Sequence, residues 1–78
     1  MADIGAIAEE IVIQLRTAGA QAAKEGIFVF LPHYLDAAEI ESLQMTLYLH
    51  SRTRYEIVHH LGERRIWVRL KQGERALW

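Results

Sequence analysis

Histidine and serine are among the residues of this chain that could act as a catalytic base, a nucleophile or a metal ligand. His59 and His60 are adjacent in a run of strand-forming residues, so their side chains point to opposite faces and cannot readily share a metal ion. Neither Ser42 nor Ser51 stands in a Gly-x-Ser-x-Gly turn or has a convincing acid partner for a triad. The five glycines match neither a phosphate-binding loop nor a dinucleotide fingerprint. We therefore expect no enzyme activity, no metal site and no cofactor.

A basic and aromatic set of residues near the C-terminus is better suited to binding a macromolecule. Tryptophan and arginine are enriched at the centres of protein interfaces, and basic side chains around an aromatic ring can also meet phosphates and stack on a base. A second interpretation is that Trp67 pairs across two strands with Val58 while arginines stack on it, as on an ordinary sheet surface. The predicted partner-binding residues are Arg54, His60, Arg65, Trp67, Arg69 and Lys71.

Apolar residues on the outer faces of two predicted helices indicate a surface for self-association. Ile13 lies on the far side of the first helix from its apolar stripe, among small residues. Met45 and Leu49 lie almost opposite the apolar stripe of the second helix. Single exposed hydrophobic residues are common, so Ile13 is equally compatible with a plain surface position.

The first 32 residues predict a helix followed by a buried strand. Asp3 is a suitable N-cap, and we expect the helix to continue through Gly19 to about Lys24, with Gly26 as its stop signal. The short apolar run 27–31, closed by Pro32, predicts a strand buried in the core. Apolar residues on the predicted core stripe of this helix are Ile4, Ile7, Ala8, Ile11, Leu15, Ala18 and Ala22.

The next segment predicts a second helix with a well-defined start. Asp36 with Glu39 three residues later matches a capping box, and Leu35 can pack against Ile40 as a hydrophobic staple. We favour a helix that continues through residues 45–50, although the alternation of apolar and polar residues there also fits a strand.

The C-terminal segment predicts a β-hairpin with two different faces. Residues 54–61 and 65–71 are rich in strand formers and are separated by Gly62-Glu63-Arg64. One face carries the basic and aromatic set described above. The other is apolar and should be covered by helices; its residues are Tyr55, Ile57, His59, Leu61, Ile66, Val68 and Leu70.

Length and composition predict that residues 1–78 form a single α+β domain, helix-strand-helix-hairpin, with both helices on one face of a small sheet. The chain is 51% hydrophobic and 24% charged, which is typical of a folded protein. It contains no cysteine, so neither a disulfide nor a thiolate metal site can stabilise a core this small, and oligomerisation is the natural supplement. No apolar run approaches the ~18 residues of a membrane span. We expect a soluble, cytoplasmic protein.

The charges are distributed unevenly along the chain. Residues 1–44 contain two basic and seven acidic side chains, whereas residues 45–78 contain seven basic and three acidic ones. The net charge of −1 therefore hides a polarity that can steer association with a charged partner or with a second copy.

Together these features predict a small non-catalytic regulator or inhibitor that binds another protein, with a homodimer left open. Chains of this size and composition are also common among phage and mobile-element inhibitors of host systems. The alternative is a nucleic-acid-binding domain that uses the basic C-terminal hairpin. The predicted element order resembles that of a winged helix, although the segment 36–54 has room for one helix where a winged helix has two.

Overall fold

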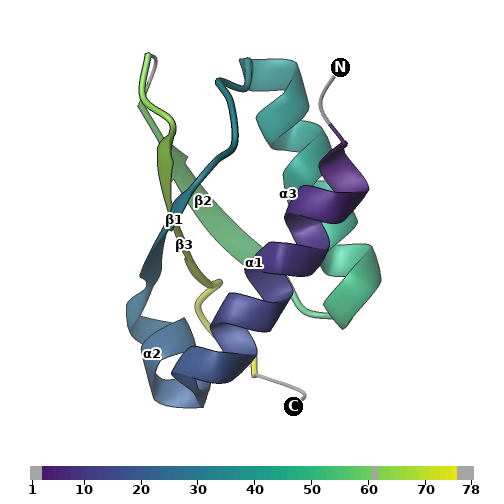
Figure 1. Ribbon diagram of the computed structural model, residues 1–78. Helices are drawn as coiled ribbons and strands as arrows, with labels where there is room; N and C mark the ends of the chain where they lie inside the picture. Colours follow the sequence, from purple (N-terminus) through teal and green to yellow (C-terminus); the bar gives the residue numbers. More distant parts are fainter. Residues whose placement is uncertain (1–2, 61, 76–78) are drawn as a thin grey trace.

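In the computed structural model, which describes residues 3–60 and 62–75, two long helices lie on one side of a three-stranded sheet (Figure 1). The sheet is antiparallel with the order β1-β3-β2, so the last strand of the chain is the central one. The predicted α+β fold with a C-terminal hairpin is confirmed. The elements are α1 (Ile4–Ala18), α2 (Ala20–Glu25), β1 (Ile27–Phe30), α3 (Ala37–Ser51), β2 (Tyr55–His59) and β3 (Arg65–Leu70).

The first predicted helix is in fact two helices, because the chain breaks at Gly19. The Asp3 carboxylate accepts a hydrogen bond of 3.0 Å from the backbone N–H of Ala6 and caps α1 as expected. Gly19 has φ +96° and ψ 165°, a conformation that residues with a side chain rarely adopt. The prediction of one continuous helix to Lys24 was therefore wrong, whereas Gly26 does end α2.

This break changes which residues of the stripe reach the core. The stripe is buried at Ile7, Ile11 and Leu15, as predicted. Ala18, the last residue of α1, is exposed. In α2, which begins after the break, Ala23 takes a fully buried position. The 3.6-residue period therefore predicts the buried positions only within an uninterrupted helix.

Strand β1 is buried on one face only, which corrects the prediction of a fully buried strand. Val29 is 2% exposed, but Phe28 and Phe30 are 61% and 76% exposed. The physical reason is that helices cover one face of this antiparallel sheet, so alternate residues of each strand point away from the core.

Helix α3 begins and continues as predicted. The carboxylate of Asp36 accepts a hydrogen bond of 2.8 Å from the N–H of Glu39, whose carboxylate accepts one of 3.1 Å from the N–H of Asp36. Leu35 is buried and Ile40 packs against the core at the positions of the expected staple. The helix runs without interruption to Ser51, so residues 45–50 are helical and the strand alternative is wrong.

The hairpin places its apolar face against the helices. Central strand β3 buries Ile66, Val68 and Leu70, and its neighbour β2 contributes the buried Tyr55. Leu61, also predicted for this face, lies outside the described residues.

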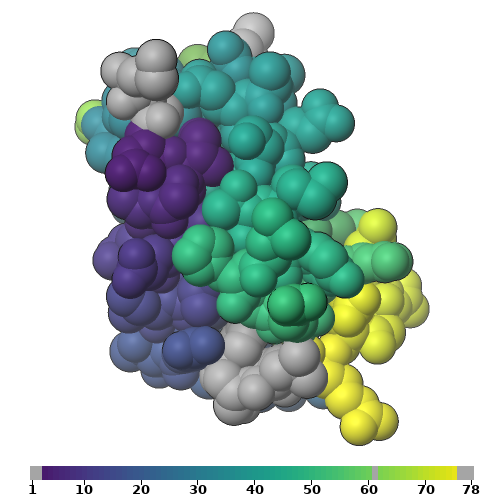
Figure 2. Space-filling view, turned by 90° about the vertical axis from the view of Figure 1, so that its right-hand side faces the viewer, coloured from purple at the N-terminus to yellow at the C-terminus, as the bar shows by residue number. Residues whose placement is uncertain are grey.

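The helical side of the molecule is a continuous surface on which α1 and α3 lie side by side (Figure 2). The core lies between these helices and the sheet. Within the described residues, no helix is long and apolar enough to cross a membrane.

Candidate binding surface

The face of the sheet that points away from the helices carries an apolar row across all three strands, with aromatic residues on two of them. Trp67 on β3 stands directly opposite Phe28 on β1 and Val58 on β2. Phe30 lies in the next row, opposite Arg65. Outward-facing residues of a half-covered sheet are usually polar, so this concentration of apolar side chains is unusual. We call this surface the sheet platform, composed of Phe28, Phe30, Val58, Arg65, Trp67 and Arg69.

Two arginines are held over the aromatic rings of the sheet platform. The guanidinium carbon of Arg65 lies 4.9 Å from the ring centroid of Phe28, and that of Arg69 lies 5.4 Å from the centroid of Trp67. Arg69 also donates a hydrogen bond of 2.6 Å from Nε to the carboxylate of Glu56, its cross-strand neighbour. These contacts restrict the arginine side chains before any partner arrives, which lowers the entropy lost on binding.

The indole ring of Trp67 packs against the backbone of Gly26. A Cβ atom built on Gly26 would overlap the indole ring, so the ring lies directly on this glycine at the end of α2. The cross-strand pair with Val58 and the stacked Arg69 enclose the ring further, and Trp67 is half-buried as a result. Trp67 therefore packs against Val58 and Arg69, as the second interpretation predicted. The part of its side chain that remains exposed is available for contact with a partner.

A shallow depression of about 250 Å³ lies on the same face. Its volume is enough for one large side chain or one base of a partner. Besides platform residues it includes Glu63 of the hairpin loop, so the depression has an apolar floor with both charge signs at its rim. It is lined by Phe28, Val58, His60, Glu63, Arg65 and Trp67.

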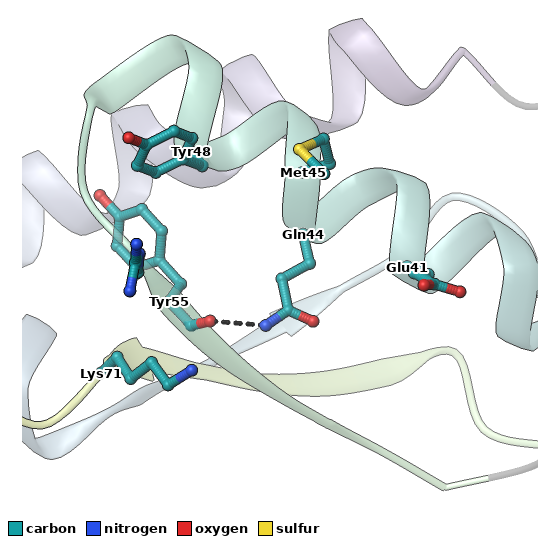
Figure 3. A pocket seen from close by; sticks show the side chains of 7 residues that line it. Glu41, Gln44, Met45, Tyr48, Tyr55 and Lys71 are labelled. Carbon is teal, nitrogen blue, oxygen red and sulfur yellow. Dashed lines mark hydrogen bonds between the residues drawn. The ribbon is translucent and has the colours of Figure 1, made fainter.

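The six predicted partner-binding residues are distributed over neighbouring depressions, and Arg69 and Lys71 line one of them together. His60, Arg65, Trp67 and Arg69 lie on or beside the sheet platform. Arg54 and Lys71 line a different depression, of about 420 Å³, between the sheet and Glu41, Gln44, Met45 and Tyr48 of α3 (Figure 3). They lie at the end of the hairpin where α3 approaches it, and their backbones are joined by a 3.0 Å hydrogen bond from the N–H of Lys71.

In this second depression Gln44 donates a hydrogen bond of 2.8 Å to the backbone carbonyl of Tyr55 (Figure 3). The Tyr55 hydroxyl is buried and has no hydrogen-bond partner of acceptable geometry among the described residues. Burial raises the pKa of Tyr55, while the nearby Ser51 hydroxyl and, to a smaller extent, the charge of Arg16 act in the opposite direction. Since Ser51 donates to the carbonyl of Leu47, we regard its effect on Tyr55 as weak.

The three predicted self-association residues are also separated. Ile13 is half exposed and lines a depression beside Ile27 and Phe28 of β1. Met45 and Leu49 are both 62% exposed and lie on α3, and Met45 lines the depression on the β2 side. One flat interface cannot include all three.

Phe28 and Phe30 are the platform residues that sequence reasoning missed. Their signal was the alternation Ile-Phe-Val-Phe, in which every second residue is aromatic. The run was interpreted as buried on both faces because all of its residues are apolar.

The described part of the chain shows no grouping of side chains suited to a metal ion. No three His, Asp or Glu side chains of residues 3–60 and 62–75 are grouped closely enough to hold a metal ion. In comparisons with protein-family models, curated proteins and solved structures, no match was found for this chain.

Proposed function

We propose that this domain is a small non-catalytic regulator that binds another protein through the sheet platform. The observation that carries the proposal is the exposure of aromatic side chains on the sheet platform, where Phe30 is 76% and Phe28 61% accessible on a face that no element of the described chain covers. An apolar patch bordered by stacked arginines has the composition of an interface centre.

The charge of the sheet platform favours a protein over a nucleic acid. Arg65 and Arg69 are accompanied by Glu56 and Glu63, and Arg69 is paired with Glu56. Binding to a phosphate backbone requires an excess of positive charge, and these two arginines and two glutamates have none. A depression next to Arg69 is more basic, since it is lined by Lys24, Lys71 and Arg75 with Glu74 as its acidic residue. Residues 31–54 also form only α3, so the chain lacks the second helix that a winged helix inserts into the major groove.

Single-stranded nucleic acid is the second candidate, because aromatic rings exposed on a sheet beside arginine can stack on bases. A titration of labelled single- and double-stranded DNA and RNA at about 50 and 200 mM salt separates the two. Binding that falls steeply with salt would replace our proposal. We expect no binding at either concentration.

The direct test compares proteins captured by tagged wild type and by three variants. Phe30→Ser and Arg65→Glu remove parts of the sheet platform, whereas Tyr34→Ser removes an equally exposed aromatic residue outside it. We expect one partner to be retained by wild type and Tyr34→Ser but lost with both platform variants, and its affinity for the purified proteins to follow the same order. A partner that binds all four equally would contradict the assignment of this surface.

Self-association belongs to the same proposal and is tested separately by sedimentation. Ile13→Glu and Met45→Glu alter the two separated apolar positions on the helices. If the protein is a dimer and only one variant dissociates it, that variant identifies the dimer interface.

A further inference from the structure

At the edge of the sheet formed by β1, some backbone groups have no partner among residues 3–60 and 62–75. The N–H of Leu31 donates a hydrogen bond of 2.7 Å to the carbonyl of Arg64, which defines these two residues as a hydrogen-bonded pair of the β1–β3 ladder. Bonded and non-bonded pairs alternate in antiparallel sheets, so Ile27 and Val29 also bond to β3. The N–H and C=O groups of Phe28 and Phe30 therefore point away from the sheet, at its free edge.

A groove runs along this edge between β1 and α1, which lie beside one another in opposite directions (Figure 1). It consists of two depressions of about 400 and 490 Å³. One extends from Val29 to Pro32, and the other borders Ile27 and Phe28. Both include Glu10 and Gln14 of α1, so the two depressions are continuous along the helix. We call them together the edge groove.

The lining of the edge groove specifies the chemistry of its occupant. All of its walls are apolar or neutral except for Glu10, which is the one charged residue among the described residues that line it. Glu10 accepts a single hydrogen bond of 3.3 Å, from the Gln14 side chain. An added strand would cover Glu10 partly, and a carboxylate that loses water requires a cationic partner.

We propose that the edge groove binds an extended segment of a partner protein as a fourth strand beside β1. Main-chain hydrogen bonds to Phe28 and Phe30 hold the segment, as in other complexes formed by strand addition. Every second side chain of the added strand faces α1. The segment therefore carries apolar residues at two such positions and a lysine or arginine between them, opposite Glu10.

A second copy of this chain fits the edge groove less well. Two β1 strands paired edge to edge would present Ile27 and Val29 to the opposite groove and would leave both Glu10 carboxylates without a cation. This inference rests on the proposed function in that the ligand is a protein, but it concerns the backbone edge of β1 and not the side chains of the sheet platform.

The test uses a labelled synthetic peptide, acetyl-Thr-Val-Thr-Lys-Thr-Val-Thr-amide, whose two valines and lysine share one face when it is extended. We expect fluorescence anisotropy to show binding to the wild-type domain. The same peptide with glutamate in place of lysine should bind about ten-fold more weakly, and Glu10→Lys should reverse this preference.

A matched pair of variants distinguishes the edge from the platform. Phe30→Thr and Phe30→Pro both remove the aromatic ring, but only proline removes the outward-pointing N–H, and it leaves the β1–β3 ladder intact. Phe30 also lines the edge groove, so the decisive quantity is the difference between the two variants, and Phe30→Pro should bind the peptide about ten-fold more weakly than Phe30→Thr. Thermal unfolding checks that both variants are folded. If Phe30→Pro does not fold, the Glu10→Lys variant tests the proposal in its place.

Two outcomes would overturn this inference. If the peptide does not bind, or if Phe30→Thr and Phe30→Pro weaken it equally, strand addition of this chemistry is wrong. If sedimentation shows a dimer that Phe30→Pro dissociates and Phe30→Thr does not, the occupant of the edge is a second copy. These results leave the proposal for the sheet platform unaffected, because it is tested by the nucleic-acid titration and by capture with Phe30→Ser and Arg65→Glu. In amide NMR spectra, peptide-induced shifts at Phe28 and Phe30 with none at Arg69 identify the edge.

Discussion

The two faces of the sheet use the same three strands for different purposes. On the covered face, Ile66 and Val68 of the central strand are 1% and 0% exposed and pack against the helices. On the sheet platform, their immediate neighbours Arg65, Trp67 and Arg69 are held by cation–π contacts and one ion pair. The buried apolar area of the sheet is therefore concentrated on one face, and the other face is the one that we propose for recognition.

The largest expected effect tests this asymmetry directly. Ile66→Ala should reduce the free energy of unfolding by about 2–5 kcal/mol, because it leaves a cavity in the core. Phe30→Ser, on the opposite face, should change it by less than about 0.5 kcal/mol. Urea unfolding of both variants measures the difference. Equal destabilisation would mean that the sheet platform is part of the folding core.

Gly26 links the two faces and gives the second prediction. Gly26→Ala should cost about 1–3 kcal/mol, because the new methyl group overlaps the Trp67 ring at a backbone φ of +106°. Gly62→Ala is the control: it has a φ of +85° but open space around the added atom, and should cost only about 1 kcal/mol. In a Trp78→Phe background, Gly26→Ala should also shift the fluorescence of Trp67 towards that of an exposed indole, whereas Gly62→Ala should not.

Tyr55 brings a polar atom to the covered face. At neutral pH, Tyr55→Phe should be neutral or stabilising within about 1 kcal/mol, since the buried hydroxyl has no hydrogen-bond partner among the described residues. Burial raises the pKa of Tyr55 above its ordinary value of 10.0. The unfolded chain therefore ionises first, and the stability contributed by the neutral phenol is present below pH 10 and lost above it. Urea unfolding between about pH 8 and 11 should show a steeper alkaline decline for wild type than for Tyr55→Phe.

The smallest effect is expected for the Glu56–Arg69 pair. Both side chains are about two-fifths exposed, so a double-mutant cycle with alanine should give a coupling energy of about 0.2–1 kcal/mol. The coupling should decrease in high salt. A value several times larger would indicate that the sheet platform contributes to stability after all.

Features that depend on residues close together along the chain were predictable from the sequence. The capping box of Asp36 and Glu39 and the turn around Gly62 were assigned correctly. The end of the first helix at Gly19 was predicted wrongly. The alanines on both sides of Gly19 favour a helix, and their combined propensity outweighs the cost of a single glycine when only neighbouring residues are considered. Of the candidate site, Trp67, Arg65 and Arg69 were placed on one face in advance, whereas Phe28 and Phe30 were not.

What the sequence determined by itself was the identity of the elements, because caps, turns and periodic stripes arise from contacts within a few residues. Only the tertiary structure decided how these elements share their surfaces. It pairs β1 with β3, which lies far along the chain, and so exposes Phe28 and Phe30 and leaves the edge groove open. It also places Gly26 beneath Trp67. The physical reason is that an apolar strand can be covered on one face or on both, and the number of layers that pack on it sets the outcome.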